Sequence, residues 1–338
     1  MLLSERQRQR YLIAESDLND PRILRPALVG GYGMDAQWND DFHHVLHVLL
    51  TEEQDGYYED YETGASGLEQ LAKAYRENFI HTRNYSRHRR RQHGDRAIDC
   101  SPSQFVVFAQ NHDQVGNRMQ GDRFSHLLSF EAQKLAAAAT LLSPSIPMLF
   151  MGEEYAETAP FLFFISHTDP QLVEAVRVGR KEEFSAFQQA GEPPDPQAIA
   201  TFAASKLNWE LRQVQPHKAL WQFYQKLLQL RIENPALRHS ERQNIEVSVL
   251  GAEHILKLRR WHQNNQVLCL LNISPSVAKF KLTLPPNTWK KLLDSTDITW
   301  GGAGSRLPDV LPTERGSTVP QQELEMSPHS VVVYGCRT

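Results

Sequence analysis

The feature that most constrains the fold is a pattern that occurs three times: a short apolar, β-prone run that ends in acidic or amide side chains. The three runs are residues 11–14, 105–109 and 146–151, and the polar clusters that follow them are 15–17, 111–113 and 153–154. Buried parallel strands read as continuous apolar runs because both of their faces are covered. Polar side chains at the carboxyl ends of such strands are typical of the catalytic rim of an α/β barrel. The pattern therefore predicts barrel strands with a functional site at their carboxyl ends.

Helical patterns lie between the predicted strands. Apolar side chains recur at helical spacing over 68–79 and 220–230, and the alanine- and leucine-rich stretch 130–142 predicts a buried helix. Strands that alternate with helices predict a parallel sheet. The segment 157–208 contains a proline-rich stretch at 192–196 and is predicted to be an insertion without continuous structure. Such an insertion is either functional or a solvated loop, and the sequence leaves both readings open.

From about residue 239 the pattern changes to short alternating or apolar runs that are separated by turns. The predicted strands are 245–250, 254–261, 266–273, 279–284 and 330–335. Short strands separated by turns predict an antiparallel β-sandwich. The predicted organisation is therefore an α/β domain over 1–238, with the insertion near 157–208, followed by a small β-sandwich domain over 239–338.

Composition and charge exclude several classes of function. The 338 residues carry 36 basic and 40 acidic side chains, and a formal net charge of −4 gives no electrostatic reason to expect a nucleic-acid partner. No apolar run approaches the length of a membrane span, so no membrane partner is expected. Cys100, Cys269 and Cys336 form no CxxC pair, which argues against a disulfide framework or a cysteine zinc site and favours a reducing, cytoplasmic location. The first ten residues contain no apolar secretory signal.

The polar clusters contain the residue types that glycoside hydrolysis needs. That reaction uses two carboxyl groups that flank the scissile bond, one of which protonates the leaving oxygen. Glu15 has the position of a general acid, because it follows a predicted strand directly, but a rim salt bridge or a helix N-cap also explains it. The side chains of 111–114 can bind sugar hydroxyls and stabilise positive charge, while an Asn or Asp that caps the next helix is the structural alternative.

Three longer motifs carry a resemblance to a known family. They are Tyr-Leu-Ile-Ala-Glu-Ser-Asp-Leu-Asn-Asp-Pro-Arg (11–22), Trp-Asn-Asp-Asp-Phe-His-His (38–44) and Phe-Ala-Gln-Asn-His-Asp-Gln-Val-Gly-Asn-Arg (108–118). In these stretches the chain resembles the malto-oligosyltrehalose trehalohydrolase family, a glycoside hydrolase family of the α-amylase superfamily. Met-Gly-Glu-Glu-Tyr (151–155) and Ser-Lys-Leu-Asn-Trp (205–209) are similar as well.

The resemblance implies a function and a set of site residues. The family hydrolyses the α-1,4 bond that joins trehalose to a maltooligosyl chain, with retention of configuration, and no cofactor is expected for this chain. Glu15 would be the proton donor, Asp113 the transition-state stabiliser, and His112 would hydrogen-bond the sugar at the cleavage site. The implied substrate contacts are Asp40, Asp41, Phe42, His43, His44, Asn111, His112, Gln114 and Asn117.

The chain departs from the family at the nucleophile. In this superfamily the nucleophilic aspartate lies on the strand before the one that bears the acid, in a motif like Gly-Phe-Arg-Leu-Asp, and 1–10 contain no such strand. The resemblance therefore implies the C-terminal half of a (β/α)8 TIM barrel, strands 5 to 8, which is inactive alone and needs a complementary N-terminal half-barrel polypeptide. The alternatives are another α-amylase relative, such as a branching or debranching enzyme, and a non-catalytic glucan-binding remnant.

Four further features have a structural reading beside a functional one. His43 and His47 have the spacing of a helical metal site, but no third ligand is evident, so no metal is predicted. The basic run 87–91 is predicted to be a solvated face. Tyr57 and Tyr58 could stack on a glucosyl unit, and core packing is the alternative for one of them. Of Glu153 and Glu154, one is expected to support the rim by hydrogen bonding.

Overall fold

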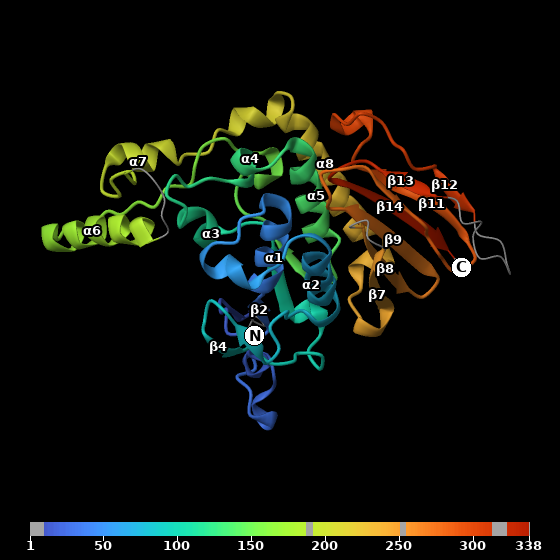
Figure 1. Ribbon diagram of the computed structural model, residues 1–338, viewed down its shortest axis with the longest axis horizontal. Helices are drawn as coiled ribbons and strands as arrows, with labels where there is room; N and C mark the ends of the chain where they lie inside the picture. The colour runs from blue at the N-terminus through green and yellow to red at the C-terminus, as the bar shows by residue number, and fades with distance from the viewer. Residues whose placement is uncertain (1–9, 187–191, 251–254, 313–322, 338) are drawn as a thin grey trace, which may run out of the picture.

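The structure is a computed structural model that describes residues 10–186, 192–250, 255–312 and 323–337. Figure 1 shows two main parts, a group of helices around short parallel strands and an antiparallel sheet, with α8 (His217–Glu233) between them. The insertion helices α6 (Pro170–Ala186) and α7 (Ile199–Ala204) lie at the end of the molecule opposite the antiparallel sheet (Figure 1). No helix within the described residues is long and apolar enough to span a membrane.

The described parallel sheet has the strand order β1-β2-β5-β6. Its strands are β1 (Ile13–Ala14), β2 (Ala36–Trp38), β5 (Phe105–Phe108) and β6 (Ile146–Met148), and each neighbouring pair is parallel. The three strands predicted from apolar runs are confirmed, although each is shorter than its run. Strand β2 was missed because it has three residues with the polar Gln37 at its centre. The parallel sheet with helices in alternation confirms the α/β class, whereas its extent as barrel strands 5 to 8 stays a prediction.

Helices follow the parallel strands along the chain. They are α1 (Asp40–Thr51), α2 (Gly64–Glu77), α3 (His112–Gly116), α4 (Phe124–Leu127), α5 (Phe130–Leu141), α8 and α9 (Pro235–Arg238). The predicted helix over 130–142 is confirmed as α5, which Ser129 caps by accepting a hydrogen bond from the Ala132 amide. The insertion is more regular than predicted, because α6 is 17 residues long and the proline-rich stretch 192–196 follows it rather than interrupting it.

The antiparallel sheet has the order β12-β11-β14-β9-β8-β7, and a separate pair β10-β13 faces it. The strands are β7 (Ile245–Leu250), β8 (Ile255–His262), β9 (Asn265–Asn272), β10 (Ala278–Phe280), β11 (Thr288–Asp294), β12 (Val310–Pro312), β13 (Leu324–Met326) and β14 (Ser330–Arg337). The predictions for β7, β8, β9 and β14 agree within two residues, except that residue 254 lies outside the described residues. The strand predicted over 279–284 is the shorter β10, and β11 to β13 were missed.

Both faces of the large antiparallel sheet are buried. Along β9, Leu268 and Leu270 pack with Phe280 and Met326 in the core between the two sheets. The residues between them, such as Cys269, face the helices and join the core of the α/β part. This two-sided burial explains why β9 reads as a continuous apolar run although its sheet is antiparallel.

Candidate active site

The carboxyl ends of the parallel strands open onto a cavity of about 300 Å³. Its lining comes from five separate stretches of sequence: Glu15, Ser16, Asp17, Trp38, Asp40, His44, Tyr57, His88, Arg89, Asn111, Asp113 and Gln114. Parallel strands place their carboxyl ends at one edge of the sheet, so residues that follow β1, β2 and β5 meet there. The cavity therefore unites the acid predicted at Glu15 with the cluster predicted at 111–114.

Glu15 lines this cavity and lies beside His112, which is absent from the described lining. The Glu15 Oε1 atom lies 3.7 Å from His112 Nε2, and the two side chains are 57% and 55% exposed. The edge of the Trp38 ring packs on the His112 ring, with centroids 6.0 Å apart. The helix N-cap reading of Glu15 fails, because Asp20 caps the helical turn that follows β1. Glu15 is thus an exposed carboxyl group beside an imidazole, and a ligand can reach both groups.

The short helix α3 holds the second half of the predicted site. Asn111 Oδ1 accepts hydrogen bonds from the amides of Asp113 and Gln114 at 2.9 and 3.1 Å, so the capping alternative is confirmed for Asn111. Asn117 Nδ2 donates to Asp113 Oδ1 at 2.5 Å and orients the Asp113 carboxylate. Asn117 therefore acts on Asp113 and is absent from the described cavity lining.

The five residues of the predicted Asp-Asp-Phe-His-His contact motif (40–44) lie on two different faces of helix α1. Asp40 and His44, one turn apart, line the cavity, whereas Asp41, Phe42 and His43 are at most 3% exposed and face the interior. These three residues are absent from the described lining of this cavity, because helical periodicity turns them into the core, and their contact with the substrate stays a prediction.

The three interior side chains contact neighbouring segments of the chain. Asp41 accepts hydrogen bonds from the Ile80 and His81 amides and from the Tyr61 hydroxyl. The His43 Nδ1–H group donates to the carbonyl oxygen of Ala109 at 2.8 Å, two residues before the 111–114 cluster. Phe42 packs edge-on against a core tyrosine ring. Asp41 and His43 therefore bond α1 to the segments 80–81 and 109, next to the 111–114 cluster.

Asp40 is a carboxyl group of the cavity lining whose pKa is strongly raised. Burial raises its pKa to about 7, and the nearby carboxylates of Asp17, Asp41 and Asp113 act in the same direction. A hydrogen bond with the Gln114 side chain opposes the shift. Asp40 therefore changes protonation near neutral pH, which lets it donate a hydrogen bond below that pH and only accept above it.

A β-hairpin covers one side of the cavity and was missed as a site element. Strands β3 (Asn84–Ser86) and β4 (Arg91–His93) present His88 and Arg89 to the lining. The Arg89 guanidinium pairs with Asp17 at 2.5 Å, so the solvated-face reading of the basic run is wrong for Arg89. The arginine run in the sequence could have indicated this element. However, only the pairing of β3 with β4 turns Arg89 toward the cavity.

The two adjacent tyrosines, Tyr57 and Tyr58, have different environments. Tyr57 lines the cavity, whereas Tyr58 is 7% exposed, packs in the core and stacks on His47 with centroids 4.2 Å apart. The His47 Nε2–H group donates to Glu53, which also accepts two hydrogen bonds from Arg118. The alternative of core packing is confirmed for Tyr58.

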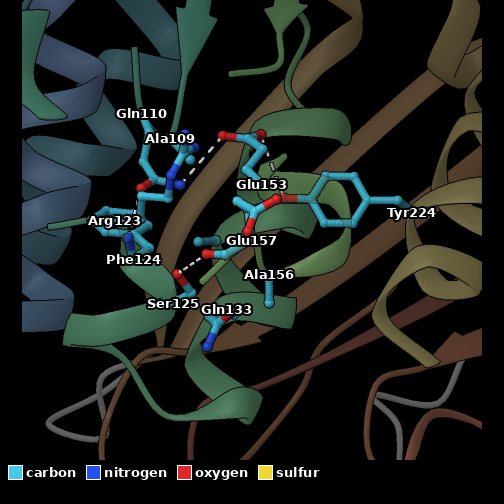
Figure 2. Close-up of a pocket in the computed structure, with 11 residues that line it drawn as sticks. Ala109, Gln110, Arg123, Phe124, Ser125, Gln133, Glu153, Ala156, Glu157 and Tyr224 are labelled. Carbon is cyan, nitrogen blue, oxygen red and sulfur yellow. Dashed lines mark hydrogen bonds between the residues drawn. The ribbon is translucent and has the colours of Figure 1, made fainter. Parts of the chain in front are cut away.

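A second, smaller cavity lies at the end of β6, and Gln110, next to the 111–114 cluster, is part of its lining. Figure 2 shows the Glu153 carboxyl group between Gln110 and Tyr224. Gln110 Nε2 and the Tyr224 hydroxyl donate to it at 3.5 and 3.4 Å, and Gln110 Oε1 accepts from the Phe124 amide. Burial raises the pKa of Glu153 to about 8. The prediction that one of the two glutamates supports the rim is confirmed for Glu153.

Known proteins resemble this chain in both of its parts. The family described as alpha amylase, C-terminal all-beta domain, matches residues 254–337. A malto-oligosyltrehalose trehalohydrolase of Saccharolobus solfataricus is 46% identical over 224 residues, which are 66% of this chain and 37% of that protein. The enzyme of the same name from Rhizobium sp. (strain M-11) is 47% identical over 242 residues, 70% of this chain and 39% of that protein. This chain is a relative of the malto-oligosyltrehalose trehalohydrolases.

Solved structures confirm the α-amylase-family fold of this trehalohydrolase relative. A candidate α-amylase from Salmonella typhimurium superposes with a TM-score of 0.77 at 33% identity, covering 97% of this chain and 51% of that one. The α-amylase of Geobacillus thermoleovorans, with a TM-score of 0.53 and 17% identity, shares the fold. The chain spans about two fifths of the length of the curated relatives it matches. The resemblance inferred from the three motifs is confirmed.

Proposed function

We propose that this chain supplies the proton donor and the transition-state-stabilising carboxylate of a retaining glycoside hydrolase that acts on malto-oligosyltrehalose. The observation that carries the proposal is the meeting of Glu15 and Asp113 in one cavity, with His112 beside Glu15. The names of the relatives support the substrate class.

Each group has a role in the cleavage of the α-1,4 bond between trehalose and the maltooligosyl chain. Glu15 protonates the glycosidic oxygen as the bond to the anomeric carbon breaks. The carboxylate of Asp113 stabilises the positive charge that develops on the sugar ring. Asp40 and Arg89 bind hydroxyl groups, and Tyr57 provides an aromatic face for a glucosyl unit. Trehalose leaves with the Glu15 proton, and water completes the second step.

Retention needs a nucleophilic carboxylate about 5–5.5 Å from the acid. We place this group outside the described residues, on a segment that pairs with the edge strand β1. Tyr11, Leu12 and Ile13 at that edge are 62%, 63% and 52% exposed, and large apolar side chains at a sheet edge favour pairing with another strand. The described residues alone are therefore proposed to be inactive, and a complementary N-terminal half-barrel polypeptide completes the site.

The test is release of trehalose from maltotriosyltrehalose by the purified chain, with and without a co-expressed polypeptide that carries the preceding barrel strands. Release only with the added polypeptide supports both the reaction and the complementation. Release by the chain alone would disprove its inactivity. If a chain shown to be folded by circular dichroism releases nothing in either case, the hydrolase proposal fails and a glucan-binding function replaces it.

Product analysis separates the related enzymes. A branching enzyme would transfer glucan chains and a debranching enzyme would cut α-1,6 bonds, so neither would give free trehalose from this substrate. We also propose a cytoplasmic location, since Cys100, Cys269 and Cys336 are all unpaired thiols.

A further inference from the structure

Arg180, on the insertion helix α6, reaches the helix that carries Asp113. Its Nη2 atom donates to the Gly116 carbonyl oxygen at 3.1 Å, and its Nη1 atom donates to Asn117 Oδ1 at 3.2 Å. Gly116 ends α3, and Asn117 is its C-cap residue. Arg180 thereby joins the insertion to the α3 segment of the candidate active site.

The insertion holds this arginine between two aromatic rings. The Arg180 guanidinium carbon lies 4.6 Å from the centroid of Phe163 and 4.6 Å from that of Phe184. Phe184 is 3% exposed, so its ring has a fixed place. Stacking on two rings restrains a guanidinium group and keeps its donors directed at α3.

The contact determines which way the Asn117 amide points. A guanidinium group has donors and no acceptor, so the atom of Asn117 that meets Arg180 must be the amide oxygen. The amide nitrogen then faces the other way, where it donates to Asp113 Oδ1 at 2.5 Å. If Asn117 were flipped, two donors would face each other and Asp113 would lose its hydrogen bond.

We propose that Arg180 is a positioning residue: it fixes the Asn117 amide, and through it the Asp113 carboxylate. The insertion, for which the sequence left a functional segment and a solvated loop open, would then act as an extension of the active site. The inference rests on the proposed role of Asp113. It assigns Arg180 no contact with the substrate.

The first test compares three variants in the preparation that releases trehalose. Arg180→Met keeps a side chain that fills the space between the two rings but has no donor, and Arg180→Lys keeps the charge without the planar fork. Arg177→Met is the matched control, because Arg177 lies on the same helix but bonds to Glu174 and Asp195. We expect kcat of Arg180→Met to fall about tenfold with KM nearly unchanged, because misplacement affects the transition state most. Arg180→Lys should recover part of the loss, and Arg177→Met should match the wild type.

The second test needs no activity and therefore separates this inference from the proposed function. The side-chain amide signals of Asn117 in the 338-residue chain, assigned by their loss in Asn117→Asp, report whether its Nδ2 protons are bonded. We expect their exchange with water to accelerate about tenfold in Arg180→Met and to stay unchanged in Arg177→Met. Equal exchange in the wild type and Arg180→Met, or equal acceleration in Arg177→Met, would overturn the inference. If no trehalose is released by any preparation, the proposed function fails, and the exchange data still decide whether Arg180 fixes the Asn117 amide.

Discussion

Arg231 and Arg260 donate to the same carbonyl oxygen, that of Ser143, although Arg231 lies on α8 and Arg260 on β8. The two N–H···O distances are 2.6 and 3.0 Å. Burial lowers the pKa of Arg260 to about 9 and that of Arg231 to about 10. Ser143 follows α5 directly, so one carbonyl group ties the helices of the α/β part to the antiparallel sheet. The α/β part and the antiparallel sheet are therefore joined by the guanidinium groups of Arg231 and Arg260, which donate to backbone carbonyl oxygens.

Arg260→Met should loosen this junction. Arg260 is 1% exposed and also donates to the carbonyl groups of Leu142, Leu237 and His239. The variant relieves the burial of a cation but leaves those carbonyls without their donor, and we expect a net loss of about 2 kcal/mol in the free energy of unfolding. Urea unfolding measures it.

The control for this prediction is Arg259→Met, one residue earlier on the same strand. Arg259 pairs with Glu246 in a partly exposed ion pair, which is worth about 1 kcal/mol or less. An equal loss in both variants would show that the sheet, rather than the carbonyl contacts, responds to the substitution.

Mild acid should destabilise the fold through α1. Burial lowers the pKa of His43 to about 3 from 6.5, and those of His44 and His47 are also lowered, first by burial. The unfolded state therefore binds more protons, so the stability is complete above pH 6.5 and is lost as the pH falls below it. His43 contributes a slope of about 1.4 kcal/mol per pH unit between its folded-state pKa and 6.5.

His43→Gln isolates one of these contributions. Between pH 6.5 and 4.5 we expect the free energy of unfolding to fall less steeply in the variant than in the wild type, by about 1.4 kcal/mol per pH unit. Urea unfolding at four pH values checks this. Parallel curves for the two proteins would mean that the folded state relaxes to hydrate His43 when it is protonated.

Glu153→Gln should have the opposite dependence on pH. Burial raises the pKa of Glu153 from 4.5 to about 8, so the unfolded state loses this proton first. The contribution of the neutral acid is present below pH 4.5 and is lost as the pH rises toward 8. Glutamine is neutral throughout, so the variant should gain stability over the wild type by about 1–3 kcal/mol between pH 5 and 8.

The exposed Glu69→Gln on α2 is the control for Glu153, since Glu69 makes only a 3.8 Å surface pair with Arg76. Unfolding curves of all three proteins at pH 5 and pH 8 give the comparison. A Glu153→Gln variant whose stability tracks the wild type at both values would show that Glu153 ionises without penalty.

Glu15→Gln and Asp113→Asn should remove activity without unfolding the chain. Both residues line the open cavity, and replacing an exposed side chain changes stability by about 0.5 kcal/mol or less. Loss of the general acid should lower kcat by about 10²–10⁴-fold, measured as trehalose release by the complemented preparation. Activity that survives Glu15→Gln would remove Glu15 from the role of proton donor.

The sequence predicted well where local pattern and burial agree. The strand β5 is buried along its whole length, so Phe105–Phe108 reads as an uninterrupted apolar run. Strand β2 and strands β11 to β13 escaped detection because they are short or contain polar residues, as in the Thr-Trp-Lys-Lys start of β11. Their pairing partners, rather than their own composition, make them strands.

In the candidate site, too, the sequence predicted some features and the packing of the chain decided the others. The residue types at Glu15 and 111–114, together with the parallel order of their strands, were enough to predict that they share one rim. Helical spacing groups Asp40 with His44, but only the packing of α1 decides that this pair faces the cavity and Asp41 the core. Similarly, the pairing of β3 with β4 brings Arg89 to Asp17 across 72 residues of sequence.

By itself the sequence determined the α/β class, the strands and helices with clear periodicity, and the chemical groups available for glycoside cleavage, because these depend on neighbours along the chain. Only the tertiary structure decided which side chains share a cavity, which carboxyl groups have raised pKa values, and that Arg180 meets Asn117. Burial and long-range contacts are properties of the packed chain, since desolvation and hydrogen-bond geometry arise only when distant segments come together.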